Sequence, residues 1–249
     1  MNSSKYGFAK RVLNAVPGSR ETLAASFTRL PDAVSPYVYE IARRTVFKDN
    51  FRRVPVFKAA LTEAAKSQNL GHYLEFGVAR GTSLVTMYKL ARGMGLASRM
   101  RFHAFDSFEG LPDDEGNFVA GDMAYSEPTF RQFVQKAGVP LDQVTTTPGF
   151  FDKSLSAELA NTLGIKPGMT HIVHVDCDLY ISTVPVLAFL APLLGNGSVI
   201  IFDDWFSFDD EPDPWMHGEQ RAFNEWPLRD RFDPVAITYP WNAAFKLVR

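Results

Sequence analysis

Short apolar segments alternate with amphipathic segments along most of the chain. The apolar segments predict strands at His72–Gly77, Met100–Asp106 and Val144–Pro148, and two more strands inside residues 171–205. A strand that is apolar along its whole length is typical of a parallel sheet covered by helices on both faces. The pattern therefore predicts an α/β fold with a mostly parallel sheet.

The amphipathic segments predict the helices that cover this sheet. The predicted helices lie at Ser83–Gly93, at Pro128–Ala137, within 150–164, between the two strands inside residues 171–205, and at Gly218–Trp226. A closing hairpin is predicted to pair Pro234–Tyr239 with Ala243–Val248. The first predicted strand, its helix and the second strand make a βαβ unit with short links. Residues 107–125 are a polar loop long enough to be functional, and we expect this loop to lie over a site.

The first 70 residues follow a different pattern. Residues 1–35 show no sustained period, and residues 37–69 contain two helical patterns separated near Val54 and Pro55. We expect residues 1–70 to form an arm and covering helices of the same domain, as a lid or an oligomer contact. The core is expected at residues 71–249.

Composition narrows the classes of function. With 249 residues, of which 46% are hydrophobic, the chain can bury a large core. The 26 basic and 28 acidic residues nearly balance, so no overall charge attracts nucleic acid or an anionic membrane. Basic residues gather near the start, where residues 1–66 hold 12 Lys and Arg against 5 Asp and Glu. The longest apolar run, Val184–Leu194, is too short to span a membrane.

The cellular compartment is predicted from two further features. The single cysteine, Cys177, excludes an internal disulfide framework and suits a reducing environment. The first residues show no apolar core of the signal-peptide type. We expect a cytoplasmic protein, and a homo-oligomer.

Two pairs of acids follow the two strands inside residues 171–205. Asp176 and Asp178 close the first strand, and Asp203 and Asp204 close the second. Ligands bind at the carboxyl edge of such sheets, and neighbouring strands lie roughly 5 Å apart. Four carboxylates would then meet in a small volume, and their repulsion normally requires a cation.

A glycine-rich turn follows the first predicted strand. Glu75, Gly77 and Gly81 lie in the segment EFGVARGTS, which lacks the three glycines of dinucleotide enzymes and the lysine of a P-loop. An acid before the turn disfavours phosphate and favours an ammonium group or hydroxyls, and S-adenosylmethionine offers both. Asp106 ends the second strand, where nucleotide-binding folds place the carboxylate that holds ribose hydroxyls. A tight turn without a ligand is the alternative interpretation.

Four segments in this order, EFGVARGTS, FDSFEGLP, HVDCDLYISTVPVL and VIIFDDW, resemble the macrocin O-methyltransferase family. The resemblance covers about residues 72–226. It implies a Rossmann-like class I S-adenosylmethionine fold, with a seven-stranded mostly parallel sheet that contains one antiparallel strand. It also implies a magnesium requirement and methylation of a sugar hydroxyl on a natural product or glycolipid.

The resemblance further implies roles for individual residues. Asp176, Asp203 and Asp204 would bind Mg²⁺, whose preference for oxygen ligands three carboxylates satisfy. Asp178 would be the general base, with His217 as the alternative, and Asp176 would share in catalysis. The residues implied in cofactor binding are Glu75, Gly77, Gly81, Ser83, Asp106, Ser107, Phe150 and Asp176.

Other residues near the acids have two interpretations each. His174 lies inside an apolar strand and is expected to be a satisfied core histidine, and Arg221 would pair with a site carboxylate or be solvated. Aromatic residues after the second acid pair would form a stacking wall for a sugar or ring, or only a hydrophobic lid contact. They are Trp205, Phe206, Phe208 and Trp215.

The expected reaction is removal of a proton from an acceptor hydroxyl while its oxygen attacks the sulfonium methyl. The expected partner is a small, sugar-containing acceptor. A catechol-type O-methyltransferase is the alternative with the same chemistry. A metal-dependent hydrolase or phosphotransferase would use the acids but leave the glycine turn and Asp106 without a role. A binding module without catalysis would not need four clustered carboxylates, whose repulsion opposes folding.

Overall fold

The computed structural model describes residues 48–248 except 210 and 239–241. The predicted arm at residues 1–35, the start of the first helical pattern and the end of the predicted strand at Tyr239 lie outside the described residues. The role expected for residues 1–70 therefore stays a prediction. None of the described helices is long and apolar enough to cross a membrane.

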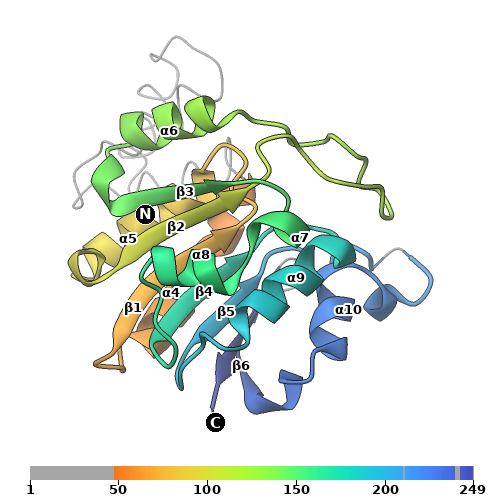
Figure 1. The fold of residues 1–249 in the computed structure, drawn as a ribbon. Helices are drawn as coiled ribbons and strands as arrows, with labels where there is room; N and C mark the ends of the chain where they lie inside the picture. Colours follow the sequence, from red (N-terminus) through yellow and green to blue (C-terminus); the bar gives the residue numbers. More distant parts are fainter. Residues whose placement is uncertain (1–47, 210, 239–241, 249) are drawn as a thin grey trace, which may run out of the picture.

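One sheet organises the fold (Figure 1). Its seven strands follow the order β3-β2-β1-β4-β5-β7-β6. They span β1 Leu70–Phe76, β2 Arg101–Asp106, β3 Val144–Pro148, β4 Thr170–Val175, β5 Val199–Phe202, β6 Phe232–Thr238 and β7 Asn242–Leu247. Strands β1 to β5 pair in parallel, and β7 is antiparallel to both β5 and β6. Among the described strands only β7 runs against the others, so the predicted fold class is confirmed.

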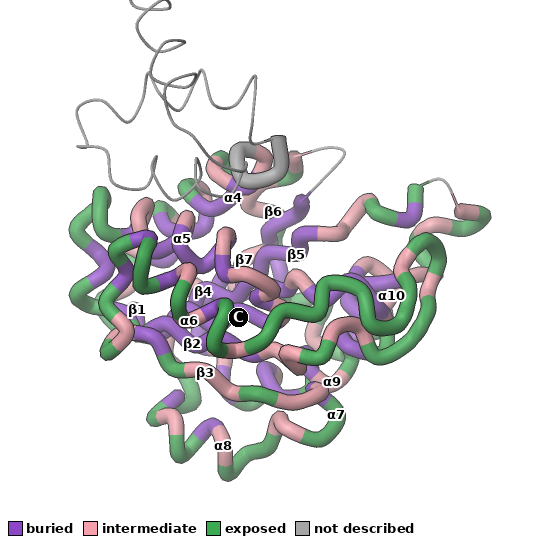
Figure 2. Tube along the Cα trace, turned by 90° about the horizontal axis from the view of Figure 1, so that it is seen from above, coloured by how far each residue is buried: buried purple, intermediate pink, exposed green. Residues whose placement is uncertain are grey.

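Helices cover both faces of the sheet. The first face carries α4 (Lys48–Ala64), α5 (Thr82–Gly93) and α6 (Glu127–Lys136), and the second carries α7 (Phe151–Ser154), α8 (Ala157–Thr162), α9 (Tyr180–Leu190) and α10 (Gly218–Glu225). Buried residues follow the central strands β1, β4 and β5, whereas the edge strands β3 and β6 are mostly half-buried or exposed, and exposed residues follow the outer loops and α8 (Figure 2). The centre of the sheet is therefore buried on both sides, as its apolar strands predicted.

Helix α4 differs from the prediction, because it continues through Pro55 where two separate helices were expected. A proline inside a helix removes one hydrogen bond and costs about 3 kcal/mol. Beyond Pro55 the helix buries Val56, Phe57 and Leu61 completely, and this apolar burial offsets that cost. The break predicted at Val54 and Pro55 was wrong.

The single helix predicted within residues 150–164 was also wrong, because the structure divides it into α7 and α8. Ser156 lies between them in an extended conformation, and its hydroxyl accepts a hydrogen bond from the N–H of Leu159 at 3.1 Å. A serine in this position caps the start of a new helix, so it ends the preceding one.

The carboxyl ends of the central strands are aligned. Phe76 is opposite Phe105 on β2 and Val175 on β4, and Val175 is opposite Phe202 on β5. The residues that follow these positions are Gly77, Asp106, Asp176 and Asp203. Register therefore brings the glycine turn, the acid that ends β2 and both acid pairs to one edge.

Three histidines lie inside the sheet, away from this edge. His72, His103 and His171 come from the adjacent strands β1, β2 and β4, and all three are buried. The Nδ1 atom of His72 lies 2.9 Å from Nε2 of His103, and the His72 and His171 rings are 5.4 Å apart. Burial lowers the pKa of His103 to about 3 and that of His171 to about 4, and the pKa of His72 is lowered as well.

We expect acid to destabilise the protein through these three histidines. The unfolded chain takes up protons below a pH of about 6.5, whereas the folded cluster takes them up only at lower pH, near the pKa of about 4 for His171 and about 3 for His103. The free energy of unfolding should then fall by about 1.4 kcal/mol per histidine for each pH unit across this window. Urea unfolding at a series of pH values would measure the slope. His103→Leu should flatten it, and an unchanged slope would assign the loss to other groups.

Candidate active site

A pocket of about 490 Å³ opens at the aligned carboxyl ends of the strands. Eight of the predicted site residues line it: Gly77, Ser83, Asp106, Ser107, Phe150, Asp176, Asp178 and Asp204. Glu75, Gly81 and Asp203 do not line it. The lid loop, which we define as residues 107–125, contributes part of the wall, including Leu111, Phe118 and Met123. The pocket volume is within the range of small-molecule sites.

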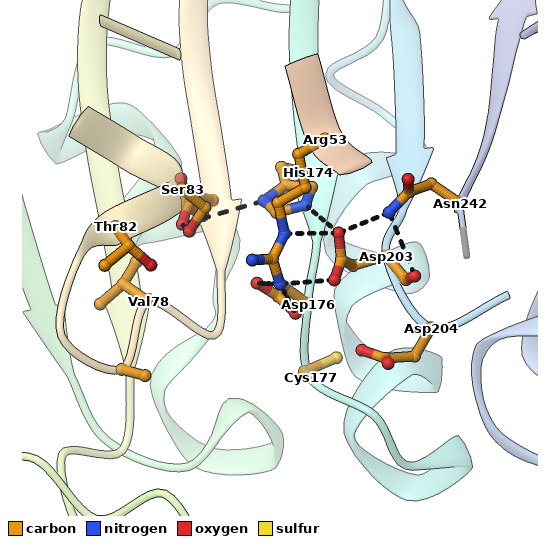
Figure 3. A network of polar contacts seen from close by, with 12 residues as sticks. Arg53, Val78, Thr82, Ser83, His174, Asp176, Cys177, Asp203, Asp204 and Asn242 are labelled. Carbon is orange, nitrogen blue, oxygen red and sulfur yellow. Dashed lines mark hydrogen bonds and ion pairs between the residues drawn. The ribbon is translucent and has the colours of Figure 1, made fainter. Parts of the chain in front are cut away.

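Two arginines of α4 reach the acids from the far end of the described chain. The Nη2 atom of Arg53 lies 2.5 Å from Oδ2 of Asp203 and 3.1 Å from Oδ2 of Asp176 (Figure 3). Nε of Arg53 also donates to Asp203 at 2.6 Å, and Arg52 donates to Asp203 at 3.1 Å. Sequence reasoning missed both residues. The excess of basic residues in 1–66 was the one sequence signal that this segment could supply a positively charged partner for the acids.

Asp203 is the most completely satisfied acid of the cluster. Its side chain is fully buried, and besides the arginines it accepts a hydrogen bond from Nδ2 of Asn242 at 2.7 Å. His174 lies 3.4 Å away through Nε2. Burial alone would raise the pKa of Asp203, but the charges of Arg53 and His174 hold it well below its usual range. Asp203 is therefore a buried anion surrounded by donors.

Asp176, Asp178 and Asp204 are the acids that face the pocket. Burial raises the pKa of Asp176 against the opposing charge of Arg53. Burial also raises the pKa of Asp178 well above its usual range, and Asp204 and Asp176 add to this shift. Asp178 has a positive φ of 61°, which is uncommon outside glycine. The turn after β4 thus holds Asp178 inside the pocket in a restricted conformation.

Glu75 lies behind the pocket wall. Its two carboxylate oxygens accept hydrogen bonds from the hydroxyls of Tyr73 and Ser83, each at 2.5 Å. His174 lies between Glu75 and Asp203, and these carboxylates outweigh the effect of burial and raise the pKa of His174 to about 10. The histidine is thus a buried core residue, as expected, but it is not fully satisfied, because its Nδ1 has no hydrogen-bond partner and lies 3.8 Å from Glu75. Glu75 does not line the pocket itself but contacts Ser83, which does.

The glycine turn is held by Asp106. One oxygen of Asp106 accepts hydrogen bonds from the N–H groups of Val78 at 2.7 Å and Ala79 at 2.9 Å, and the other from Phe108 at 2.7 Å. Gly77 has a φ of 83°, and a side chain there would collide with the carbonyl of Asp176. The close approach at Gly77 is therefore to the neighbouring strand end. A carboxylate has about four acceptor positions, so Asp106 retains capacity toward the pocket.

Glu219 is a further acid that sequence reasoning missed. It lies in the first turn of α10, fully buried, and accepts hydrogen bonds from the N–H groups of Cys177 at 3.3 Å and Asp204 at 3.1 Å. One side chain thus connects the backbones of both acid pairs. Its position in a polar helix gave no sign of this contact.

The aromatic residues interpreted as a stacking wall do not line the pocket. Trp205 packs on Phe202 and Phe223 of the core, and Phe208 stacks on His217 with ring centroids 5.3 Å apart. Phe206 and Trp215 also lie outside the pocket lining, as does Arg221, whose guanidinium pairs with Glu225 at 2.9 Å. The residues of the lid loop replace them as the apolar part of the wall.

The acid cluster has the ligand atoms for a divalent cation, but arginine side chains also bind some of them. Carboxylate oxygens of Asp176, Asp203 and Asp204 all lie within 4.8 Å of one another, and three carboxylates suit Mg²⁺. Asp176 and Asp204 are partly exposed to the pocket, but Asp176 also accepts hydrogen bonds from Nη2 of Arg53 at 3.1 and 3.3 Å, so this guanidinium would have to withdraw before Asp176 could bind an ion freely. Asp203 would join them only if the guanidinium of Arg53 moved away.

Two curated O-methyltransferases of Streptomyces are similar to part of this chain. A tetracenomycin-C 4'-O-methyltransferase of Streptomyces olivaceus is 32% identical over 146 residues, which make up 54% of this chain and 53% of the relative. A demethyldecarbamoylnovobiocin O-methyltransferase of Streptomyces niveus is 30% identical over the same shares. The chain thus spans about half the length of the curated relatives it matches.

Solved structures show the same fold. The calicheamicin methyltransferase CalS11 superposes with a TM-score of 0.65 at 19% identity, over 93% of this chain and 94% of the other. The O-methyltransferase NovP superposes with a TM-score of 0.62 at 21% identity, over 80% and 81%. The family model of the macrocin-O-methyltransferases (TylF) matches residues 50–212. This chain belongs to the macrocin-O-methyltransferase (TylF) family.

Proposed function

We propose that this protein is an S-adenosylmethionine-dependent O-methyltransferase that methylates a hydroxyl of a sugar moiety. The observation that carries the proposal is the convergence of Asp176, Asp178 and Asp204 on one pocket that the glycine turn also lines. The relative from Streptomyces olivaceus is named for a tetracenomycin that bears a rhamnosyl group, which supports a sugar as the acceptor.

The cofactor would bind along the glycine turn and the start of α5. The first turn of α5 contains no acid and its N-terminus has no side-chain cap, so its N–H groups can bind the carboxylate of the amino acid end. Ser83 and Asp106 line the same part of the pocket and can accept hydrogen bonds from the amino group and the ribose. Phe150 offers an apolar face for the adenine.

Asp178 would act as the general base. It lies in the pocket with 4% of its surface exposed, beside Asp176 and Asp204. A raised pKa makes a carboxylate a stronger base once it is ionised, and Asp178 can then take the proton of an acceptor hydroxyl. Because the methyl donor is already activated by its sulfonium, the remaining work of the protein is to align the reactants and exclude water.

A divalent cation at Asp176 and Asp204 would supply the charge that lowers the pKa of the acceptor hydroxyl. Asp176 and Asp204 would hold it, with Asp203 as a third ligand when Arg53 withdraws. Glu219 would keep the two ligands at a fixed separation, since it binds the backbone of Asp204 and of Cys177, the residue after Asp176. The cytoplasmic location and the homo-oligomer stay predictions from the sequence.

Calorimetry tests whether the protein binds the cofactor, and a methyl-transfer assay tests whether the reaction needs a divalent cation. S-adenosylhomocysteine, the demethylated product, should bind with and without EDTA. Transfer of a labelled methyl group from S-adenosylmethionine to a panel of rhamnosyl glycosides should stop in EDTA and return with Mg²⁺. If neither S-adenosylmethionine nor its product binds, the protein is not a methyltransferase. Full turnover in EDTA would remove the cation from the mechanism.

A further inference from the structure

The lid loop is attached to the body of the protein at few points. Between residues 111 and 126 every residue is exposed except Leu111, Glu115 and Phe118. The loop closes on itself, because the N–H of Leu111 donates to the carbonyl of Asp122 at 3.0 Å and the N–H of Gly121 donates to Leu111 at 2.9 Å. Glu115 and Phe118 lie on the excursion between these ends. Nearer the ends of the loop, Phe108 packs on Phe130 and Arg80 lies over the Tyr125 ring, and between them Glu115 and Phe118 make the contacts with the rest of the described chain.

Glu115 binds two helices at once. One carboxylate oxygen accepts a hydrogen bond from the N–H of Tyr180 at 2.7 Å, and the other from the N–H of Gly218 at 2.8 Å. Tyr180 is the first residue of α9 and Gly218 the first of α10, and neither helix has a side-chain cap of its own. N–H groups at helix starts lack partners inside the helix, and a negative charge is favourable there.

Phe118 completes the attachment. Its ring lies 5.7 Å from the ring of Phe208, which is itself buried and stacked on His217. The Nδ1 atom of His217 lies 3.9 Å from the carboxylate of Glu115. The tip of the lid loop thus packs against the segment that joins β5 to α10.

We propose that Glu115 is a positioning residue that fastens the lid loop over the pocket and fixes the turn that carries Asp178. Tyr180, which Glu115 binds, lies two residues after Asp178, and Gly218 approaches the Asp178 backbone so closely that a side chain there would lie 2.8 Å from its carbonyl oxygen. One carboxylate therefore couples the placement of the lid loop to that of the base. The role in methyl transfer rests on the proposed function, whereas the attachment does not.

The test uses the protein without cofactor or acceptor. In Glu115→Ala we expect amide hydrogen exchange at Tyr180 and Gly218 to rise by about tenfold or more, since each amide loses a bond to a charged partner. Glu115→Gln keeps one acceptor oxygen and should give an intermediate rate. Cys177 is the single cysteine and lines the pocket, so its alkylation rate should rise in the same order. Glu109→Gln removes an exposed charge from the same loop and should match the parent.

Each outcome decides the proposal. Faster exchange confined to the lid loop and the starts of α9 and α10, with β1 and β4 unchanged, supports it. Parent-like exchange at Tyr180 and Gly218 in Glu115→Ala would overturn it. Faster exchange throughout the sheet would also overturn it, because Glu115 would then act on global stability. If Glu115→Ala does not fold, Glu115→Gln gives the same comparison. Failure of the methyltransferase proposal would leave all these results unaffected.

Discussion

Replacement of Asp178 by asparagine is expected to lower methyl transfer by about 10²- to 10⁴-fold, the contribution typical of a positioned general base. The amide keeps the shape of the side chain but cannot accept the proton. S-adenosylhomocysteine should bind the variant as it binds the parent, because the glycine turn and Asp106 are unchanged. Turnover assays and calorimetry on the same preparation would measure both effects.

The pH dependence of the parent enzyme adds a second check on this role. Burial, with Asp204 and Asp176, raises the pKa of Asp178 well above its usual range, and the base must be ionised to act. The rate should therefore rise with pH through the raised pKa, and Asp178→Asn should lose this rise. Asp122→Asn removes an exposed carboxylate from the pocket rim and is the matched control.

Near-parent turnover in Asp178→Asn would assign the proton transfer to another group. His217 was the alternative from the sequence. Its side chain stacks on Phe208 and does not line the pocket, so the structure favours Asp178. His217→Gln would separate the two residues directly.

Replacement of Arg53 by methionine is expected to lower the free energy of unfolding by about 3–5 kcal/mol, because it leaves a buried carboxylate with fewer donors. Arg53 forms hydrogen bonds and ion contacts with Asp203 and Asp176, the shortest at 2.5 Å. Arg52, Asn242 and His174 would remain near Asp203. Urea unfolding in EDTA would measure the loss.

Magnesium gives this variant a second readout. If the acids can hold a divalent cation, Mg²⁺ should recover part of the stability that Arg53→Met loses, since the ion can take the position of the guanidinium. The control is Arg131→Met, which removes a partly exposed arginine 3.8 Å from Glu127 and should cost under about 1 kcal/mol. Equal losses for the two variants would show that the buried ion pair contributes little.

The sequence predicted the sheet and the placement of the acids well, for a physical reason. Strands that are apolar throughout specify a covered parallel sheet, and acids directly after such strands must lie at its carboxyl edge. Asp176, Asp178 and Asp204 accordingly line the pocket, and Asp203 follows β5 as expected.

The partners of these acids could not be predicted in the same way. Arg53 lies 150 positions from Asp203, and Glu219 lies 42 positions from Cys177, so no local spacing reports either contact. Glu75 shows a related limit. An acid at the end of a strand suggested direct ligand binding, but Glu75 does not line the pocket and accepts hydrogen bonds from the hydroxyls of Tyr73 and Ser83, which its position in the sequence did not indicate. The direction in which an acidic side chain points depends on polar partners that are near it in space but can be distant in the sequence.

Asp203 joins the first described helix to the last strand, through Arg53 on α4 and Asn242 on β7. During synthesis, the ribosome must therefore release Asn242 before this carboxylate can accept all of its hydrogen bonds. Contacts between distant parts of a chain form slowly, since a long loop must close first. An incompletely folded chain would lack the hydrogen bond from Asn242 to this buried carboxylate and would hold a poorly formed pocket. The acid cluster thus makes catalytic competence a late event in folding, reached only when both ends of the domain are in place.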